Sequence, residues 1–177
     1  MKVIDTKIPE VKIIEPIVYG DARGFFLETF QEKRYRESLG LTQKFVQDNH
    51  SRSTRGVLRG LHFQKQKPQG KLVRVVRGEV FDVAVDIRAD SPTFGQWEGI
   101  ILSEENHLQF WVPPGFAHGF LVLSEIADFE YKCTDYYDPS DEGSVRWNDP
   151  VINISWPLID NVTLSAKDEK APLLVDL

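Results

Sequence analysis

The short apolar segments of this chain alternate between hydrophobic and polar residues, which is the pattern of β-strands with one buried face. In residues 128–134, for example, Phe129, Tyr131 and Cys133 share one face, and Glu130 and Lys132 share the other. A helix would instead repeat its apolar positions every three or four residues. The period of two therefore predicts that the chain is mostly β-structure.

Segments with strand character are separated by glycine, proline and acidic residues. The predicted strands cover residues 11–18, 24–30, 44–49, 72–76, 80–87, 99–102, 107–112, 117–123 and 128–134. Residues 31–39 predict one helix, which Gly40 ends, and its thin apolar content (Tyr35 and Leu39) places it on the surface. The end of the chain is expected to be irregular. This pattern predicts an all-β fold, an antiparallel sandwich or barrel formed by residues 1–177 as a single domain.

Residues 77–79 (Arg-Gly-Glu) separate two of these strands and predict a tight turn, so that the strands form a hairpin. In the second strand, Asp82 and Asp86 lie on the face opposite the large apolar side chains. Charged groups on an otherwise apolar hairpin need a water-filled cavity or a solvated surface. Two interpretations stay open here: a polar cavity near His62, or an exposed sheet face on which His62 is an ordinary surface histidine.

The composition of the chain disfavours several classes of function and location. The formal net charge of −6 argues against nucleic-acid binding through bulk charge. Cys133 is the only cysteine, so the chain has no internal disulfide and no cysteine-based zinc site, as expected for a reducing cytoplasm. The first residues lack the apolar core of a signal peptide, and no apolar run approaches the ~20 residues that span a membrane. We expect a cytoplasmic protein without nucleic-acid or membrane partners.

Two histidines follow the spacing of the cupin motifs. Gly56 and His62, with five residues between them, match the start of the first motif, and residues 113–118 (PPGFAH) match the second, which ends at His118. Gln64 stands where the first motif has its second histidine, and the usual glutamate is missing. Metal sites usually need at least three protein ligands, and the ammonium of Lys71 would repel a cation. We expect no metal and no cofactor; alternatively, both histidines merely fill the mouth of a barrel.

Longer segments extend this likeness. They are DARGFFLETF (21–30), FVQDNHSRS (45–53), GVLRGLHFQ (56–64), QGKLVRVVRGEVFDVAVDIR (69–88), SPTFGQW (91–97), VPPGFAHGF (112–120), YKCTDYYDP (131–139), RWNDP (146–150) and LSAKD (164–168). Together they resemble the dTDP-4-dehydrorhamnose 3,5-epimerases, the metal-free cupin enzymes of dTDP-L-rhamnose synthesis. The resemblance implies a jelly-roll antiparallel β-barrel with few short peripheral helices.

The family reaction inverts C3 and C5 of dTDP-4-dehydro-6-deoxy-D-glucose, the two carbons beside the C4 ketone, and gives dTDP-4-dehydro-L-rhamnose. The resemblance implies that His62 is the base, paired with Asp168. A histidine ring is basic yet largely neutral at pH 7, and a carboxylate on its second nitrogen stabilises the imidazolium that forms. By the same resemblance, Lys71 stabilises the C4 enolate and Tyr131 donates a proton on the opposite face.

The resemblance also implies the residues that bind the sugar nucleotide. They are Arg23, Glu28, Gln47, Asn49, Arg59, Lys71, His118, Tyr137, Glu142 and Lys167. Guanidinium groups suit a diphosphate, amides can hydrogen-bond to a thymine, and Tyr137 is expected to stack on that base. In the family, Arg23 and Glu28 reach the site of a neighbouring subunit, so a homodimer with shared sites is expected.

Several alternatives remain at this point. Relatives that invert only C3 or only C5, and ketoisomerases of other dTDP-deoxysugar pathways, use overlapping residues. A non-catalytic or metal-dependent cupin that binds a small ligand is a further possibility. Individually, Asp168 could be a solvated residue of the tail, and the alternation around Tyr131 fits an aromatic residue packed beside Phe129 and Cys133.

Overall fold

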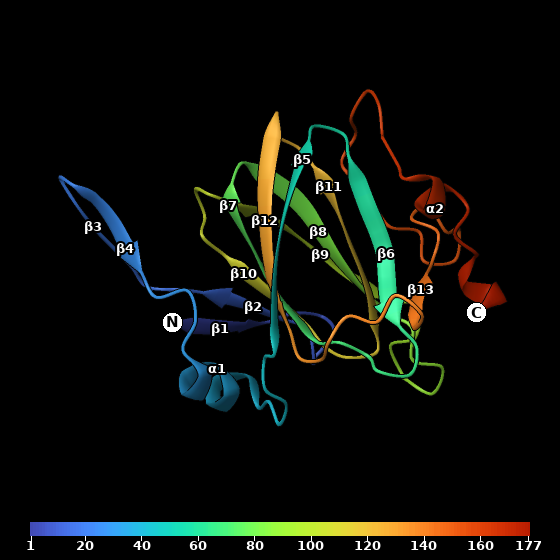
Figure 1. Ribbon diagram of the computed structural model, residues 1–177, viewed down its shortest axis with the longest axis horizontal. Helices are drawn as coiled ribbons and strands as arrows, with labels where there is room; N and C mark the ends of the chain where they lie inside the picture. The colour runs from blue at the N-terminus through green and yellow to red at the C-terminus, as the bar shows by residue number, and fades with distance from the viewer.

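The computed structural model describes residues 1–177 and contains two antiparallel sheets that face each other (Figure 1). In spatial order, the six-stranded sheet consists of β1 (Lys2–Asp5), β2 (Lys12–Glu15), β10 (Gln109–Val112), β7 (Lys71–Arg77), β12 (Ile126–Cys133) and β5 (Gln47–Thr54). The five-stranded sheet consists of β13 (Glu142–Ser144), β6 (Leu58–Gln64), β11 (Phe116–Val122), β8 (Glu79–Asp86) and β9 (Trp97–Ser103). The predicted all-β fold is confirmed. No helix is long and apolar enough to cross a membrane.

The main hydrophobic core lies between the two sheets. Val73, Val75 and Phe129 come from the six-stranded sheet, and Phe120 is one of those from the five-stranded sheet. The rings of Phe120 and Phe129 stack with their centroids 4.2 Å apart, which joins the sheets directly. The alternation predicted for residues 128–134 is confirmed, because Phe129 and Cys133 are buried while Lys132 points outward to Asp48.

The predicted hairpin around residues 77–79 is wrong. β7 pairs with β10 and β12, whereas β8 pairs with β11 and β9, so the turn carries the chain from one sheet to the other. Gly78 has a φ of +75°, and a Cβ there would lie 2.0 Å from the carbonyl oxygen of Ile126. The turn is tight, as expected, but Val75 and Val80 on either side of it meet in the core between the sheets. Local alternation cannot distinguish this crossing from a hairpin.

The exposed sheet face considered for β8 is also wrong. The face with Asp82 and Asp86 points between the sheets, and both carboxylates are fully buried. The opposite face is covered by the C-terminal segment, whose Ile152 and Leu174 pack against Val83 and the neighbouring side chains. Asp82 therefore needs partners inside the barrel, because a buried charge is stable only when it is paired.

The helices are short and peripheral, as predicted. α1 (Glu32–Leu39) begins where the side chain of Gln31 accepts a hydrogen bond from the backbone N–H of Arg34, and Gly40 ends it in the left-handed conformation. The helix lies on the surface except for Tyr35, which is fully buried and donates to the carbonyl of Thr29 at 3.0 Å. Burial raises the pKa of Tyr35 to about 12.

Several boundaries differ from the expected ones. Residues 11–18 contain the whole of β2 and the first residue of β3 (Val18–Asp21), because Pro16 interrupts the pairing between them. β3 and β4 (Gly24–Leu27) form a separate two-stranded hairpin that projects from the barrel (Figure 1). The C-terminal segment contains three short elements that the sequence did not predict. They are β13, α2 (Ala166–Glu169) and the 3-10 helix η1 (Leu174–Asp176).

Candidate active site

A cavity of about 330 Å³ lies between the two sheets and holds most of the predicted site residues. Its walls come from β5, β6, β7 and β12 and from the segment that leads into β13. The lining residues are Gln47, Asn49, His62, Phe63, Gln64, Gln69, Lys71, Tyr131, Tyr137 and Glu142. The cavity is therefore polar, in contrast to the core beside it.

His62 lies on β6, next to a close approach between β6 and β11. Gly60 has a φ of +125°, and a Cβ there would lie 2.6 Å from the Cα of Gly119. A bulge after His118 accommodates this approach and leaves His118 directly opposite His62. Glycine at position 60 thus allows the strand geometry that presents His62 to the cavity.

Asp168 binds the ring of His62. Its Oδ1 lies 2.5 Å from Nε2, although 106 residues separate the two in sequence. The His62 side chain is 31% exposed and that of Asp168 only 4%, so the pair opens to the cavity through the imidazole. Burial by itself raises the pKa of Asp168, but the hydrogen bond and charge of His62 outweigh it and leave this pKa below the ordinary value. Nδ1 forms no hydrogen bond and is free to act as a base toward a bound molecule.

Lys71 brings a free ammonium group to the cavity. The residue is 8% exposed, and its Nζ forms no hydrogen bond and no ion pair within the chain. Burial lowers the pKa of Lys71, while the nearby charges of Asp82 and Glu142 oppose this effect. In its protonated form, which these carboxylates favour, Lys71 can stabilise a negative charge that develops on a ligand.

Tyr131 faces the same cavity from the other sheet. It lies on β12, whereas His62 lies on β6 in the five-stranded sheet. Its hydroxyl has no hydrogen-bond partner in the chain, and burial raises its pKa, so the phenol stays protonated near neutral pH. A base and a protonated acid thus approach one space from opposite sides.

This chain is similar to known proteins over nearly its whole length. Residues 5–176 match the family model of dTDP-4-dehydrorhamnose 3,5-epimerase. The chain belongs to this family, and it is an isomerase. The enzyme of that name from Salmonella typhimurium is 60% identical, over 98% of this chain and 96% of its own.

Solved structures of this family have the same fold. The epimerase of Legionella pneumophila, solved in complex with dTDP-4-keto-L-rhamnose, is 65% identical with a TM-score of 0.97, covering 98% of this chain and 93% of its own. ChmJ of Streptomyces bikiniensis, a 3'-monoepimerase solved with dTDP-quinovose, is 36% identical with a TM-score of 0.91, covering 97% of this chain and 87% of its own. The jelly-roll fold is thus shared by double and single epimerases.

His118, predicted to form a wall of the epimerase site, lies behind the cavity rather than along it. Its Nε2 is 2.9 and 3.0 Å from the two carboxylate oxygens of Asp82. Burial raises the pKa of Asp82, and His118 and Lys71 oppose this rise. Sequence reasoning did not assign Asp82 to the site, although the alternation along β8 had singled out its polar face.

Five of the residues predicted to bind substrate form one network at the mouth of the cavity. The Tyr137 hydroxyl donates to Glu142 at 2.9 Å, and Lys167 forms an ion pair with the same carboxylate. Gln47 accepts a hydrogen bond from the backbone N–H of Tyr137 and donates to Asn49 at 3.0 Å. Burial by itself would raise the pKa of Glu142, but Lys167 and Tyr137 lower it on balance.

Three other predicted residues do not line this cavity. Arg59 is exposed and donates to the hydroxyl of Ser53 at 3.0 Å. Arg23 lies at the tip of the β3–β4 hairpin, is 90% exposed, and forms an ion pair with Asp21. Glu28 follows β4 and forms an ion pair with Arg34. Within one chain the structure does not bring Arg23 or Glu28 to the other epimerase residues.

Phe63, Gln64 and Gln69 line the cavity without having been predicted as site residues. Gln64 donates to the carbonyl of Lys67 at 2.7 Å and accepts from the backbone N–H of Asp138 at 2.7 Å, so it holds two loops at the cavity mouth. Gln69 donates to the carbonyl of Asp135 at 2.8 Å. The motif position of Gln64 is the one signal in the sequence, and it indicates only a lost metal ligand. No group of three or more His, Cys, Asp or Glu side chains is arranged to hold a metal ion.

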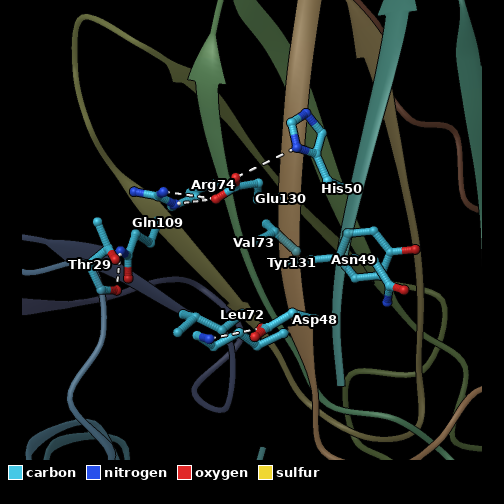
Figure 2. A pocket seen from close by; sticks show the side chains of 11 residues that line it. Thr29, Asp48, Asn49, His50, Leu72, Val73, Arg74, Gln109, Glu130 and Tyr131 are labelled. Carbon is cyan, nitrogen blue, oxygen red and sulfur yellow. Dashed lines mark hydrogen bonds and ion pairs between the residues drawn. The ribbon is translucent and has the colours of Figure 1, made fainter. Parts of the chain in front are cut away.

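A second cavity, of about 300 Å³, lies on the other face of the six-stranded sheet (Figure 2). Its charged side chains are paired with one another, Arg74 with Glu130 at 2.8 Å and Lys132 with Asp48 at 2.8 Å. Figure 2 shows the side chains of Asn49 and Tyr131 pointing away from Arg74 and Glu130. The side chains of His62, Lys71 and Tyr131 all line the first cavity.

Proposed function

We propose that this chain inverts C3 and C5 of dTDP-4-dehydro-6-deoxy-D-glucose and yields dTDP-4-dehydro-L-rhamnose. The observation that carries the proposal is the placement of His62 and Tyr131 on opposite sheets, facing one cavity that also contains the ammonium of Lys71. Inversion of a carbon requires that a proton leave one face and that another arrive on the opposite face. Family membership and the relatives' names support the same reaction.

In the proposed mechanism, Nδ1 of His62 removes the proton from a carbon beside the C4 ketone. The C–H bonding electrons form a C=C bond, and the carbonyl π electrons move to the C4 oxygen, which becomes an enolate beside Lys71. Asp168 stabilises the imidazolium through Nε2, as a triad carboxylate does. The enolate then collapses as Tyr131 delivers its proton to the other face. The imidazolium returns its proton to solvent, the phenolate takes one up, and the cycle repeats at the second carbon.

The sugar nucleotide is held by the network at the cavity mouth. The ring of Tyr137 is half exposed and can stack on the thymine, while the amides of Gln47 and Asn49 can pair with its polar edge. The charge of Arg59 acts on Tyr131, and its guanidinium suits two oxygens of the diphosphate. These groups bind the part of the substrate that does not react, and so orient the sugar toward His62.

Incubation with dTDP-4-dehydro-6-deoxyglucose in D₂O, followed by NMR, tests the function. We expect deuterium at both C3 and C5, with the L-rhamno product trapped by a reductase. Deuterium at one carbon only would instead favour the second candidate, a single-centre epimerase. The likeness to the 3'-monoepimerase ChmJ supports this candidate. Absence of exchange in folded protein that binds dTDP would reject both candidates.

Replacing Lys71 by methionine is expected to lower kcat roughly 10²–10³-fold, because the enolate loses its preorganised cation. The binding of dTDP should change little, since Lys71 acts on the sugar oxygen rather than on the nucleotide. Lys12, whose ammonium is bound to Asp5 at the edge of the six-stranded sheet, provides the matched control. Equal kcat values for Lys71→Met and Lys12→Met in steady-state assays would contradict the proposed role.

We further propose that the enzyme needs no metal or other cofactor. The nitrogens Nε2 of His62 and His118 are each bound to a carboxylate, and the ammonium of Lys71 supplies positive charge near them. Treatment with a chelator is therefore expected to leave kcat and KM unchanged. Loss of turnover that returns on addition of one particular divalent metal would refute this expectation.

We also propose that the enzyme is a homodimer whose two chains share their active sites. The β3–β4 hairpin extends from the barrel (Figure 1) and exposes Tyr19, Phe25 and Phe26 by 61–68%. Exposed aromatic residues on a projecting element suit burial against another protein. Because Arg23 lies at the tip of this hairpin, we propose that it reaches the diphosphate in the site of a second copy.

Mixing two impaired variants tests the shared site. Arg23→Ala is expected to lower kcat/KM roughly 10–10²-fold through loss of a charged hydrogen bond to the diphosphate. When Arg23→Ala and His62→Ala chains are unfolded together and refolded, each mixed dimer regains one native site. Half the dimers are mixed, so about a quarter of the wild-type activity should return. No recovery, with mixed dimers shown to be present by mass spectrometry, would place Arg23 in its own chain's site.

The remaining expectations concern domain and location. We propose that residues 1–177 act as one domain, because both sheets contribute to a common core and the C-terminal segment covers one of them. The free and buried thiol of Cys133 supports a reducing compartment such as the cytoplasm. Both remain predictions.

A further inference from the structure

We propose that Asp149, in the RWNDP segment, is a positioning residue that holds the C-terminal segment in place and thereby fixes Asp168 against His62. The inference rests on the proposed role of the His62–Asp168 pair. Asp149 itself does not contact either residue of the pair. Its effect would pass through the hydrogen bond that the backbone N–H of Leu174 donates to its carboxylate, six residues after Asp168 in the chain.

The chain around Asp149 is fixed relative to His62. β13 pairs with β6, with Ser144 directly opposite His62. The next residue, Val145, exchanges both backbone hydrogen bonds with Leu61, at 2.9 and 3.1 Å. The RWNDP segment begins one residue later, so the strand that carries His62 also sets the position of this segment.

Asp149 is 1% exposed, and three backbone N–H groups donate to its carboxylate. Oδ1 accepts from Val151 at 2.8 Å and Ile152 at 3.0 Å, which closes a local turn. Oδ2 accepts from Leu174 at 2.8 Å, across 25 residues of sequence. A carboxylate with hydrogen bonds on both oxygens can join the turn and the C-terminal segment rigidly.

Arg146 attaches the same C-terminal segment at two more points. Its backbone N–H donates to the carbonyl of Pro172 at 2.8 Å, and its Nε donates to the carbonyl of Ala171 at 3.2 Å. With the bond from Leu174 to Asp149, three hydrogen bonds hold residues 171–174 against residues 146–149. Asp168 lies three residues before the first of these attachments.

On the other side of Asp168, the chain is attached to the start of β6. Thr163 donates to the carbonyl of Gly56 at 2.8 Å and accepts from the N–H of Leu58 at 3.0 Å. Between the two attachments lies α2, only four residues long, with the N–H of Asp168 donating to Ser165. A single helical turn is not stable by itself, so its position depends on both attachments together with the ion pair of Lys167 and Glu142. Loss of the attachment at Asp149 would let Asp168 move away from His62.

The variant Asp149→Asn tests the inference, because it keeps the shape and Oδ1 but places an N–H₂ group against the N–H of Leu174. We expect kcat to fall roughly 10–10²-fold, the cost of a small misplacement of a catalytic pair. The matched control is Asp86→Asn, which alters another buried carboxylate, bound by Arg88, Ser91 and Thr93 at the far end of β8. It should lower the melting temperature without lowering kcat in the folded protein.

A double-mutant cycle separates positioning from general damage. If Asp149 acts through Asp168, adding Asp149→Asn to Asp168→Asn should lower kcat no further. If the decreases in kcat of the two single variants multiply in the double variant, the inference is wrong. It is also wrong if folded Asp149→Asn keeps the full kcat. Should Asp149→Asn fail to fold, Arg146→Met removes one side-chain hydrogen bond from the same segment and goes through the same cycle. A fully active Asp168→Asn variant would reject the proposed His62–Asp168 pair, and the inference about Asp149 with it. If Asp168→Asn is slow but Asp149→Asn is as fast as the wild type, only the inference about Asp149 is rejected.

Discussion

Replacement of His62 by alanine is expected to abolish deuterium incorporation at both C3 and C5, with kcat roughly 10⁴-fold lower or more, as for other enzymes that lose a general base acting within a dyad or triad. The physical reason is that Nδ1 of this ring is the free basic nitrogen in the cavity, while Nε2 is bound to Asp168. Both carbons flank the same ketone, so one base serves both after the sugar turns in the site. NMR of the substrate in D₂O measures each carbon separately.

The matched control is His50→Ala. His50 lies on β5, and its ring faces Asp128 and Glu130 on the outside of the six-stranded sheet. It should exchange both carbons at the wild-type rate. Substantial exchange by folded His62→Ala would mean that the base is elsewhere, whereas loss at only one carbon would require a second base for the other.

Replacement of Tyr131 by phenylalanine is expected to remove the epimerised product while some proton exchange at a sugar carbon persists. His62 can still form the enolate, but only the face from which the proton left can be reprotonated. Loss of a general acid typically lowers the rate of the affected step roughly 10²–10⁴-fold. The measurement combines deuterium incorporation with trapping of the L-rhamno product. Only in this variant should deuterium be incorporated while no product is trapped.

Tyr136→Phe is the corresponding control, since Tyr136 is 65% exposed and does not line the cavity. Product formation by Tyr131→Phe at the rate of this control would leave Tyr131 as an aromatic residue of the core, beside Phe129. The substitution retains the ring, so the contact between the rings of Tyr131 and Phe129, 6.0 Å apart, should be kept and the fold preserved.

The sequence predicts many strands of this barrel, because their alternation follows from burial of one face, but it misses β1, β6 and β13 and starts β5 three residues early. It does not predict which strands pair. Residues 72–76 and 80–87 resemble a hairpin by every local criterion, yet β7 and β8 belong to different sheets. Pairing depends on contacts between residues far apart in the chain, such as Phe120 and Phe129, and alternation contains no information about them.

In the candidate site, too, the local sequence does not predict which distant residues come together. Nothing in the spacing of LSAKD links Asp168 to His62, and only the resemblance to a family suggested the pair. Gln69 and Asp82 have no motif of their own and were found through the cavity and through the partner of His118. Arg23 and Glu28 lie far from the cavity in one chain, so their predicted role depends on a second chain, which the sequence does not describe.

The stack of Phe120 on Phe129 joins two sheets that carry different halves of the proposed chemistry. Phe129 lies two residues from Tyr131 on β12, and Phe120 lies two residues from His118, which is opposite His62. The thickness of these two rings therefore sets the gap that a sugar must fill between its proton donor and its proton acceptor. A smaller or larger side chain at either position would change the separation of the two sheets. It would therefore change turnover as well as folding, because the hydrophobic core sets the distance between His62 and Tyr131.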